Sequence, residues 1–158
     1  MARVNNNFGF RLPTSNFKQL ILTMKLVACG LWLVACGQIS NKDTKFQQYY
    51  VQGQQLYIKN CSNCHQKNGA GLGLVYPPIN TSDFMDQNVD AVLCIMKYGK
   101  EGEIIVNGKK FNKPMKGISS LTELEIAEIA TYIYNTWDHQ LGMIEIAQVT
   151  TQLNKCDN

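Results

Sequence analysis

The pentapeptide Cys61-Ser62-Asn63-Cys64-His65 carries more structural information than any other part of this chain. A C-x-x-C-H run is the signature of covalent haem attachment. Its two thiols lie on one helical turn, where each can add to a vinyl group of the porphyrin. The imidazole of the next residue then lies beneath the iron as its proximal ligand. We therefore expect one covalently bound haem, held by Cys61, Cys64 and His65.

Two other kinds of site share part of this pattern. A C-x-x-C pair is also the redox couple of thioredoxin-like proteins, but no βαβ pattern surrounds it here. The pair could instead be half of a zinc site, which would need further cysteine or histidine ligands. No second Cys/His pair exists, because His139 is the only other histidine in the sequence. Haem attachment is the stronger interpretation.

Length and charge favour one domain behind a basic leader. The chain has 158 residues and a formal net charge of +3. Residues 1–36 contain four Arg or Lys and no acid, whereas residues 37–158 contain 11 Lys and 12 Asp or Glu, which leaves about one negative charge. Because the positive balance comes from the leader, it gives no argument for a nucleic-acid partner.

Residues 1–36 are predicted to be an export signal of the lipoprotein type. The stretch ends Leu33-Val34-Ala35-Cys36-Gly37, which resembles the lipobox in which bacterial lipoproteins lipidate a cysteine. Cys29 lies in a similar run, but more apolar sequence precedes Cys36. We therefore expect Cys36 to anchor an exported protein to the membrane on its periplasmic side. A start at Met24, a plain secretory signal and an uncleaved anchor stay open.

A polar tether at 37–43 should lead into a domain at 44–158. Thr44 and Gln47 fit a capping box, so a helix is expected to start at Asp43-Thr44. Gly53 would cost about 1 kcal/mol relative to alanine in this helix, which predicts a close helix crossing that no Cβ permits. A merely tolerated glycine is the alternative. The residues that share one face of this helix are Phe46, Tyr49, Tyr50, Gly53 and Tyr57.

Four further elements are expected after the haem-attachment run. A glycine-rich loop at 69–73 should fold against the haem, and a helix at 88–98 should end at Gly99. Asn107-Gly108 predicts a β-hairpin at 104–111. Thr122 with Glu125, and Leu121 with Ile126, fit a capping box and hydrophobic staple at the start of another helix. The apolar face of that helix is expected to comprise Ile126, Ile129, Ala130, Ile133 and Trp137.

The remaining cysteines predict a disulfide. Once Cys36 is lipidated and the C-x-x-C pair holds haem, only Cys94 and Cys156 stay unassigned besides the leader's Cys29. Such a pair in an exported protein favours a disulfide, which would dock a last helix at about 143–155 onto the helix at 88–98. Two free buried thiols are the alternative.

The second axial ligand of the iron is predicted to be Met115. It lies in Lys113-Pro114-Met115-Lys116-Gly117, where proline and glycine favour a non-helical excursion that can direct a thioether toward the iron. Thioether ligation raises the reduction potential. The other candidates are Met85, Met96, Met143 and His139.

With these motifs the chain resembles the class I c-type cytochromes, in particular small membrane-tethered bacterial ones, over about residues 46–137. The resemblance implies an all-α fold of about four to five helices around one haem c, with one small hairpin before the methionine loop. It also implies that Gly53 and Tyr57 cross Ile129 and Tyr132, and that the Pro77 carbonyl accepts a hydrogen bond from Nδ1–H of His65. The hairpin, residues 138–158 and the proline before Met115 depart from the family pattern, so propionate partners are not carried over.

We expect a monomeric electron carrier rather than an enzyme, working between respiratory-chain partners outside the cytoplasmic membrane. Its lysines near the haem edge would dock to an acidic patch on the partner, unless they are an ordinary solvated face. A haem-based gas sensor and a haem subunit of a larger oxidase or reductase are the alternatives. The predicted docking lysines are Lys109, Lys110, Lys113 and Lys116.

Overall fold

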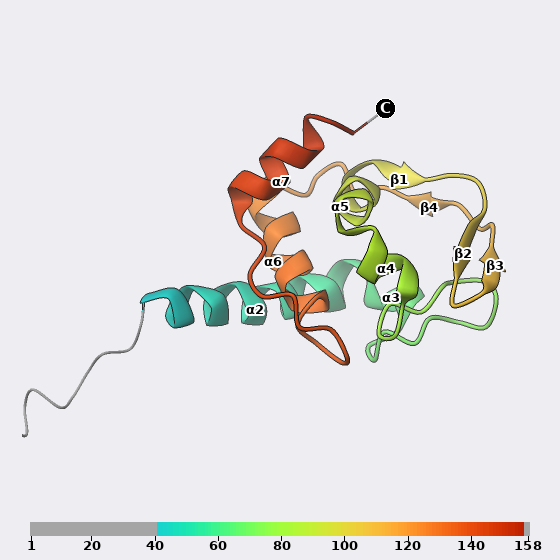
Figure 1. Cartoon of the computed structure of the whole chain (residues 1–158), viewed down its shortest axis with the longest axis horizontal. Helices are drawn as coiled ribbons and strands as arrows, with labels where there is room; N and C mark the ends of the chain where they lie inside the picture. Colours follow the sequence, from blue (N-terminus) through green and yellow to red (C-terminus); the bar gives the residue numbers. More distant parts are fainter. Residues whose placement is uncertain (1–40, 157–158) are drawn as a thin grey trace, which may run out of the picture. The chain divides into compact units, whose positions relative to one another are not determined.

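The computed structural model describes residues 41–156, and these form a mainly helical domain, as expected (Figure 1). The predicted leader lies outside the described residues, and so do its cysteines Cys29 and Cys36. The helices are α2 (Asn41–Asn60), α3 (Ser62–His65), α4 (Asp83–Gln87), α5 (Val89–Tyr98), α6 (Glu123–Ile133) and α7 (Ile146–Leu153). The strands are β1 (Gly99–Lys100), β2 (Ile104–Val106), β3 (Lys109–Phe111) and β4 (Met115–Lys116).

Helix α2 begins earlier than predicted. Its first residue is Asn41, so Thr44 lies inside the helix and does not cap it. Three residues of the tether expected at 37–43 are therefore helical, and the other four lie outside the described residues. The capping-box pattern was misleading here because polar residues before a helix fit a cap at several registers.

The crossing of α2 and α6 is the main helix contact of the domain, and Gly53 lies at its centre (Figure 1). A Cβ atom at Gly53 would lie 1.9 Å from the carbonyl oxygen of Glu128 and 2.9 Å from the Cβ of Tyr132. The rings of Tyr57 and Tyr132 pack beside this contact, with centroids 5.5 Å apart. The close crossing predicted from Gly53 is therefore confirmed.

Helix α6 has the predicted start and an unpredicted end. The hydroxyl of Thr122 accepts a hydrogen bond from the Glu125 amide, and the Glu125 carboxylate accepts one from the Thr122 amide, so the capping box is confirmed. The helix ends at Ile133, and Trp137 has a φ of +60°, so Trp137 is not part of the helix face. Its ring nevertheless packs against Tyr57 and Tyr132.

The β structure comprises two small antiparallel pairs rather than the single hairpin expected. Strands β2 and β3 form the predicted hairpin around Asn107-Gly108, both of which have positive φ as a two-residue turn of this kind requires. Strands β1 and β4 form a second pair, in which Lys100 lies opposite Met115. This second pair fixes the backbone of Met115.

The C-terminal segment is fastened to the rest of the domain in two ways. Helix α7 is shorter than the 143–155 expected, and a disulfide joins Cys94 of α5 to Cys156 just after α7, with Cα atoms 5.8 Å apart. This is the pair that the cysteine count predicts. Its sequence separation is 62 residues, and the chain-entropy model gives about 4 kcal/mol of stabilisation for a loop of that size.

The second fastening is the buried side chain of His139. Its Nδ1 lies 2.8 Å from a carboxylate oxygen of Asp86, and its Nε2 lies 2.8 Å from the carbonyl oxygen of Ile79. The neighbouring Tyr134 hydroxyl donates to the carbonyl of Met85. The segment after α6 therefore holds the segment that runs from Ile79 to Asp86. Among residues 41–156, no helix combines the length and the apolar character that crossing a bilayer would require.

Gly53→Ala should destabilise the folded protein strongly. The new methyl group would meet backbone atoms of α6 that cannot move without separating the helices, so we expect a loss of about 3 kcal/mol in the free energy of unfolding. Denaturant unfolding of the haem-loaded protein measures it. Gln55→Ala, on the same helix away from the crossing, is the control. Equal stability of the two variants would show that the crossing is not tight.

His139→Phe should also lower the stability. A phenyl ring preserves the edge contact with Tyr134, but it leaves the Ile79 carbonyl without its donor. An unpaired buried acceptor costs about 1–3 kcal/mol, and denaturant unfolding would show this loss. Gln140→Ala, at the exposed neighbouring position, should be nearly neutral. No loss of stability in His139→Phe would mean that these hydrogen bonds contribute nothing.

Candidate haem site

The haem-attachment run lies at the junction of α2 and α3. Cys61 follows the last residue of α2, and the amide of His65 donates to the Cys61 carbonyl across one helical turn. This turn brings both thiols and the imidazole onto one short helix. The turn is held from below by Tyr57, whose hydroxyl donates to the carbonyl of Gln66 at 2.6 Å. Cys61 and Cys64 are both free thiols and half-buried.

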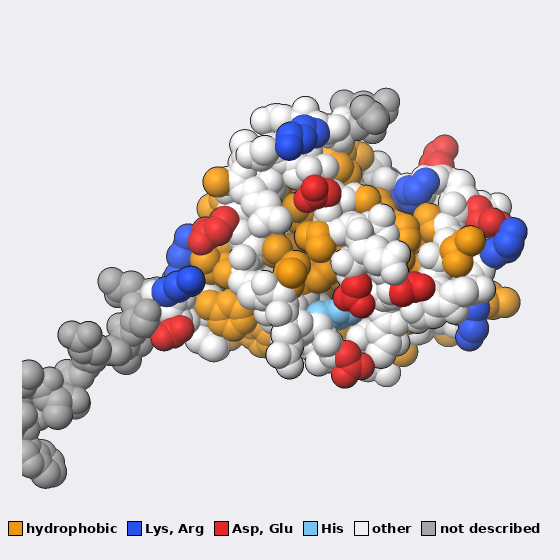
Figure 2. Space-filling view, viewed as in Figure 1, with side chains coloured by type: hydrophobic (Ala, Val, Ile, Leu, Met, Phe, Trp, Pro, Cys, Tyr) orange, Lys and Arg blue, Asp and Glu red, His pale blue; other side chains and the backbone are white. Residues whose placement is uncertain are grey.

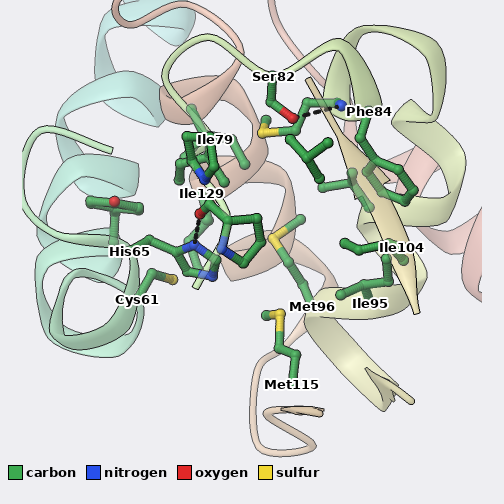
Figure 3. A pocket seen from close by; sticks show the side chains of 17 residues that line it. Cys61, His65, Ile79, Ser82, Phe84, Ile95, Met96, Ile104, Met115 and Ile129 are labelled. Atoms are coloured by element: carbon green, nitrogen blue, oxygen red, sulfur yellow. Dashed lines mark hydrogen bonds between the residues drawn. The ribbon is translucent and has the colours of Figure 1, made fainter. Parts of the chain in front are cut away.

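The imidazole of His65 is oriented by Pro77. Its Nδ1 lies 3.1 Å from the Pro77 carbonyl oxygen (Figure 3). A carbonyl only accepts, so Nδ1 carries the proton and Nε2 keeps its lone pair. Burial lowers the pKa of His65, and the bond to Pro77 opposes this shift in part. The ring is therefore neutral and fixed in the tautomer that a metal ligand needs.

The glycine-rich loop holds Pro77 in place. A Cβ atom at Gly71 would lie 2.3 Å from the carbonyl oxygen of Tyr76 and 2.6 Å from the carbonyl carbon of Pro77. The φ of Gly71 is +67°, in the left-handed region that favours glycine. The amide of Ile79 also donates to the Gly69 carbonyl at 2.7 Å. The loop at 69–73 thus packs against the segment that orients His65.

His65 opens onto an apolar cavity of about 620 Å³ (Figure 3). This volume is in the range of small-molecule and cofactor sites. The one polar side chain besides His65, Cys61 and Tyr57 is Ser82, whose hydroxyl is already engaged with the Met85 amide. A flat apolar group bound through two thiols at one edge and an imidazole on one face fits these walls. The apolar lining includes Ile79, Phe84, Ile95, Met96, Ile104, Val106, Ile129 and Ile133.

Met115 is placed to reach this cavity from a different segment than His65. It lines the apolar cavity and also the adjoining open depression at the Cys64 side. Met85 and Met96 line the cavity too, but both belong to helices and are buried in the core. Met143 packs against the core and lines neither space. Both ring nitrogens of His139 are engaged, so it is not available as a ligand.

The cysteine pair does not have the properties of a thioredoxin-like couple. Burial raises the pKa of the Cys61 thiol to about 12, with a further contribution from Cys64. A nucleophilic redox thiol instead needs a lowered pKa. Within the described part of the chain, no cluster of three or more His, Cys, Asp or Glu could hold a metal ion. Neither alternative to haem attachment gains support.

The four lysines predicted to surround the haem edge separate into two pairs. Lys113 and Lys116 line the open depression, and the Lys113 ammonium lies 5.9 Å from the centre of the Tyr76 ring. Lys109 and Lys110 lie on β3 and line neither space; Lys110 forms an ion pair with Glu103. Positive and negative side chains alternate at the end of the molecule that carries the strands (Figure 2).

Sequence reasoning missed Lys100, which also lines the open depression. It lies opposite Met115 in the β1–β4 pair. Because this pairing joins residues about 15 apart through two-residue strands, no local pattern announces it. The hydrogen bond of the Tyr76 hydroxyl with Cys64 raises the pKa of that phenol, which places Tyr76 beside the second attachment thiol at the same opening.

Comparisons with known proteins agree with this site. Cytochrome c-552 of Thermus thermophilus is 29% identical over 91 residues, which are 55% of this chain and 69% of that protein. A second cytochrome c-552 from another strain of the same species is equally similar, and the aligned part is 61% of its length. A cytochrome c subunit of a quinone alcohol dehydrogenase from Gluconacetobacter polyoxogenes is 27% identical over 104 residues, which are 63% of this chain and only 22% of that protein.

Residues 50–133 match the family model described as cytochrome c oxidase, cbb3-type, subunit III. The match spans more than half of the chain. It includes the attachment run, Pro77, Met115 and the crossing residues of α6. This protein therefore belongs to that family, and it is a class I c-type cytochrome that carries electrons on covalently bound haem c.

Proposed function

We propose that His65 and Met115 are the two axial ligands of the haem iron, and that Cys61 and Cys64 are its attachment thiols. The single observation that carries this proposal is that an imidazole held by the Pro77 carbonyl and the Met115 thioether reach one apolar cavity from separate segments. The cavity also borders Cys61. The thioether would favour ferrous iron and raise the reduction potential.

Such a site supports electron transfer rather than catalysis on a substrate. Bound haem supplies a one-electron change of valence. Side chains would fill both axial positions in each valence state, which keeps structural reorganisation small and leaves no open position for a substrate. The apolar walls exclude water, and the Cys64 side of the cavity stays open to the surface. This opening is the proposed route for the electron.

Met115→Ala should remove the sixth ligand. In ferric wild-type protein we expect the weak far-red absorption band of His/Met ligation. The variant should lose this band, show a lower reduction potential and bind CO rapidly in the ferrous state. Met96→Leu, which alters another thioether that lines the cavity, should retain the band. Rapid CO binding by the wild type would instead favour the gas-sensor alternative.

The proposed docking surface is the opening near Cys64, with Lys113 and Lys116 from the predicted set and Lys100 beside them. The exposed apolar side chains of Leu72, Leu74 and Val75 belong to the loop that ends at Tyr76, at the same opening. Lysines around an apolar contact suit a redox protein with an acidic patch. Complexes of this type are small and transient, and the charges mainly accelerate encounter. Lys109 and Lys110 would contribute less.

Lys113→Glu/Lys116→Glu should slow electron transfer to an acidic redox protein. With an anionic flavodoxin as the probe, we expect the second-order rate constant to fall roughly tenfold or more at low ionic strength. The difference should disappear at high salt. Lys109→Glu/Lys110→Glu makes the same charge change outside the opening and is the matched control. Equal effects of the two double variants would contradict the assignment, and so would rates that ignore ionic strength.

We further propose that the protein is exported and anchored as a lipoprotein through Cys36, and that it serves respiratory partners on the periplasmic side. The support is the leader sequence, with its apolar run and Leu33-Val34-Ala35-Cys36-Gly37. Mass spectrometry of the mature protein should find an N-terminal cysteine with the mass of the lipid added. An unmodified first residue would exclude the anchor.

A second candidate role is that of a haem subunit in a larger redox complex. One relative is by its name the cytochrome c subunit of a quinone alcohol dehydrogenase, and the matching family is named for an oxidase subunit. The two roles differ in the size of the native particle. A free carrier would leave solubilised membranes as a monomer, whereas a subunit would co-purify with its complex.

A further inference from the structure

One wall of the haem cavity is the β2–β3 hairpin. Ile104 and Val106 of β2 line the apolar cavity, and Phe111 of β3 lines the open depression. Each strand has only three residues, and an isolated two-stranded hairpin is marginally stable in water. The hairpin lies at the edge of the domain, beside α4 (Figure 1). Something must therefore hold it against the cavity.

Its turn is fastened to the segment before α4 by three hydrogen bonds. The amide of Asn107 donates to a carboxylate oxygen of Asp83 at 2.7 Å, and the amide of Asp83 donates to Oδ1 of Asn107 at 3.1 Å. Nδ2 of Asn107 also donates to the Thr81 carbonyl at 2.6 Å. Asn107 and Asp83 thus each pair a side chain with the backbone of the other.

These contacts explain a choice that turn chemistry leaves open. Glycine, aspartate and asparagine all suit the first position of an Asn-Gly type turn. Only the asparagine amide can both accept from the Asp83 amide and donate to the Thr81 carbonyl. Neither Asn107 nor Asp83 lines the cavity or the depression, so the pair acts through the segments that it joins.

The two joined segments lead to the two proposed ligands. The Thr81–Asp83 segment follows Pro77, which orients His65, and precedes Phe84 and Met85 of the cavity wall. The hairpin leads after Phe111 directly to Met115. A fastening between Asn107 and Asp83 therefore fixes the wall on the Met115 side relative to the wall on the His65 side.

We propose that Asn107 and Asp83 are a positioning pair that closes the haem cavity against water and small ligands and keeps Met115 on the iron. The proposal rests on the His65 and Met115 ligation proposed above. Without the pair, the hairpin separates from the Thr81–Asp83 segment more often. Water then enters and stabilises the more highly charged ferric haem, and the Met115 thioether yields its position more readily to an added ligand.

Asn107→Gly tests this directly, because glycine keeps the positive φ of the turn and removes both side-chain hydrogen bonds. We expect CO binding to the ferrous protein to accelerate roughly 5- to 30-fold, the factor that a loss of one or two hydrogen bonds allows, and the reduction potential to fall. Asp83→Ala should behave alike. Asp83→Asn keeps an acceptor oxygen and should behave as the wild type.

Thr150→Ala controls for a general loss of stability, since it removes a side-chain hydrogen bond between α7 and Glu123 away from the hairpin. It should leave CO binding and potential unchanged. The proposal is overturned if Asn107→Gly matches the wild type or Thr150→Ala, or if Asp83→Asn fails to preserve the wild-type values. If Asn107→Gly does not retain haem, Asp83→Ala and Asp83→Asn decide alone. A wild type without the far-red band would instead contradict the axial ligation itself.

Discussion

The backbone contact between α2 and α6 at Gly53 determines where the rest of this molecule can be. Helix α2 runs without interruption from this contact to Asn60, so the angle of the crossing sets the position of Cys61 and His65. The same contact presents Ile129 and Ile133 of α6 as the floor of the cavity. Tyr57, Tyr132 and Trp137 pack their rings around the crossing and make it rigid.

Around this framework the chain fixes the haem environment by hydrogen bonds to backbone carbonyls. Pro77 orients His65, Ile79 accepts from His139, and Met85 accepts from Tyr134. All three carbonyls belong to one irregular segment between the attachment run and α5. A segment with so little secondary structure of its own needs such external partners. The residues beyond α6, which exceed the minimal family core, supply two of the three.

Local chemistry made much of the structure predictable. The attachment run, the Thr122–Glu125 capping box, the Asn107-Gly108 turn and the Cys94–Cys156 pair each depend on residue types at short or countable spacings. The errors lie where distant segments decide. Thr44 fits a cap that the longer helix makes unnecessary, and Trp137 continues the helical spacing after the backbone has left the helix. Lys100 reaches the haem opening only through the pairing of β1 with β4, and the roles of His139 and Asn107 depend on partners more than 20 residues away.

The Cys94–Cys156 disulfide has a consequence for the order of assembly. An environment that oxidises these two thiols, 62 residues apart, oxidises Cys61 and Cys64 more readily still, because they are only three residues apart. Thioether formation needs the latter pair reduced. In the folded domain the Cys61 thiol has a pKa of about 12 and reacts slowly. A selective reductant must therefore protect Cys61 and Cys64, and haem has to be joined to them before the domain closes around Cys61.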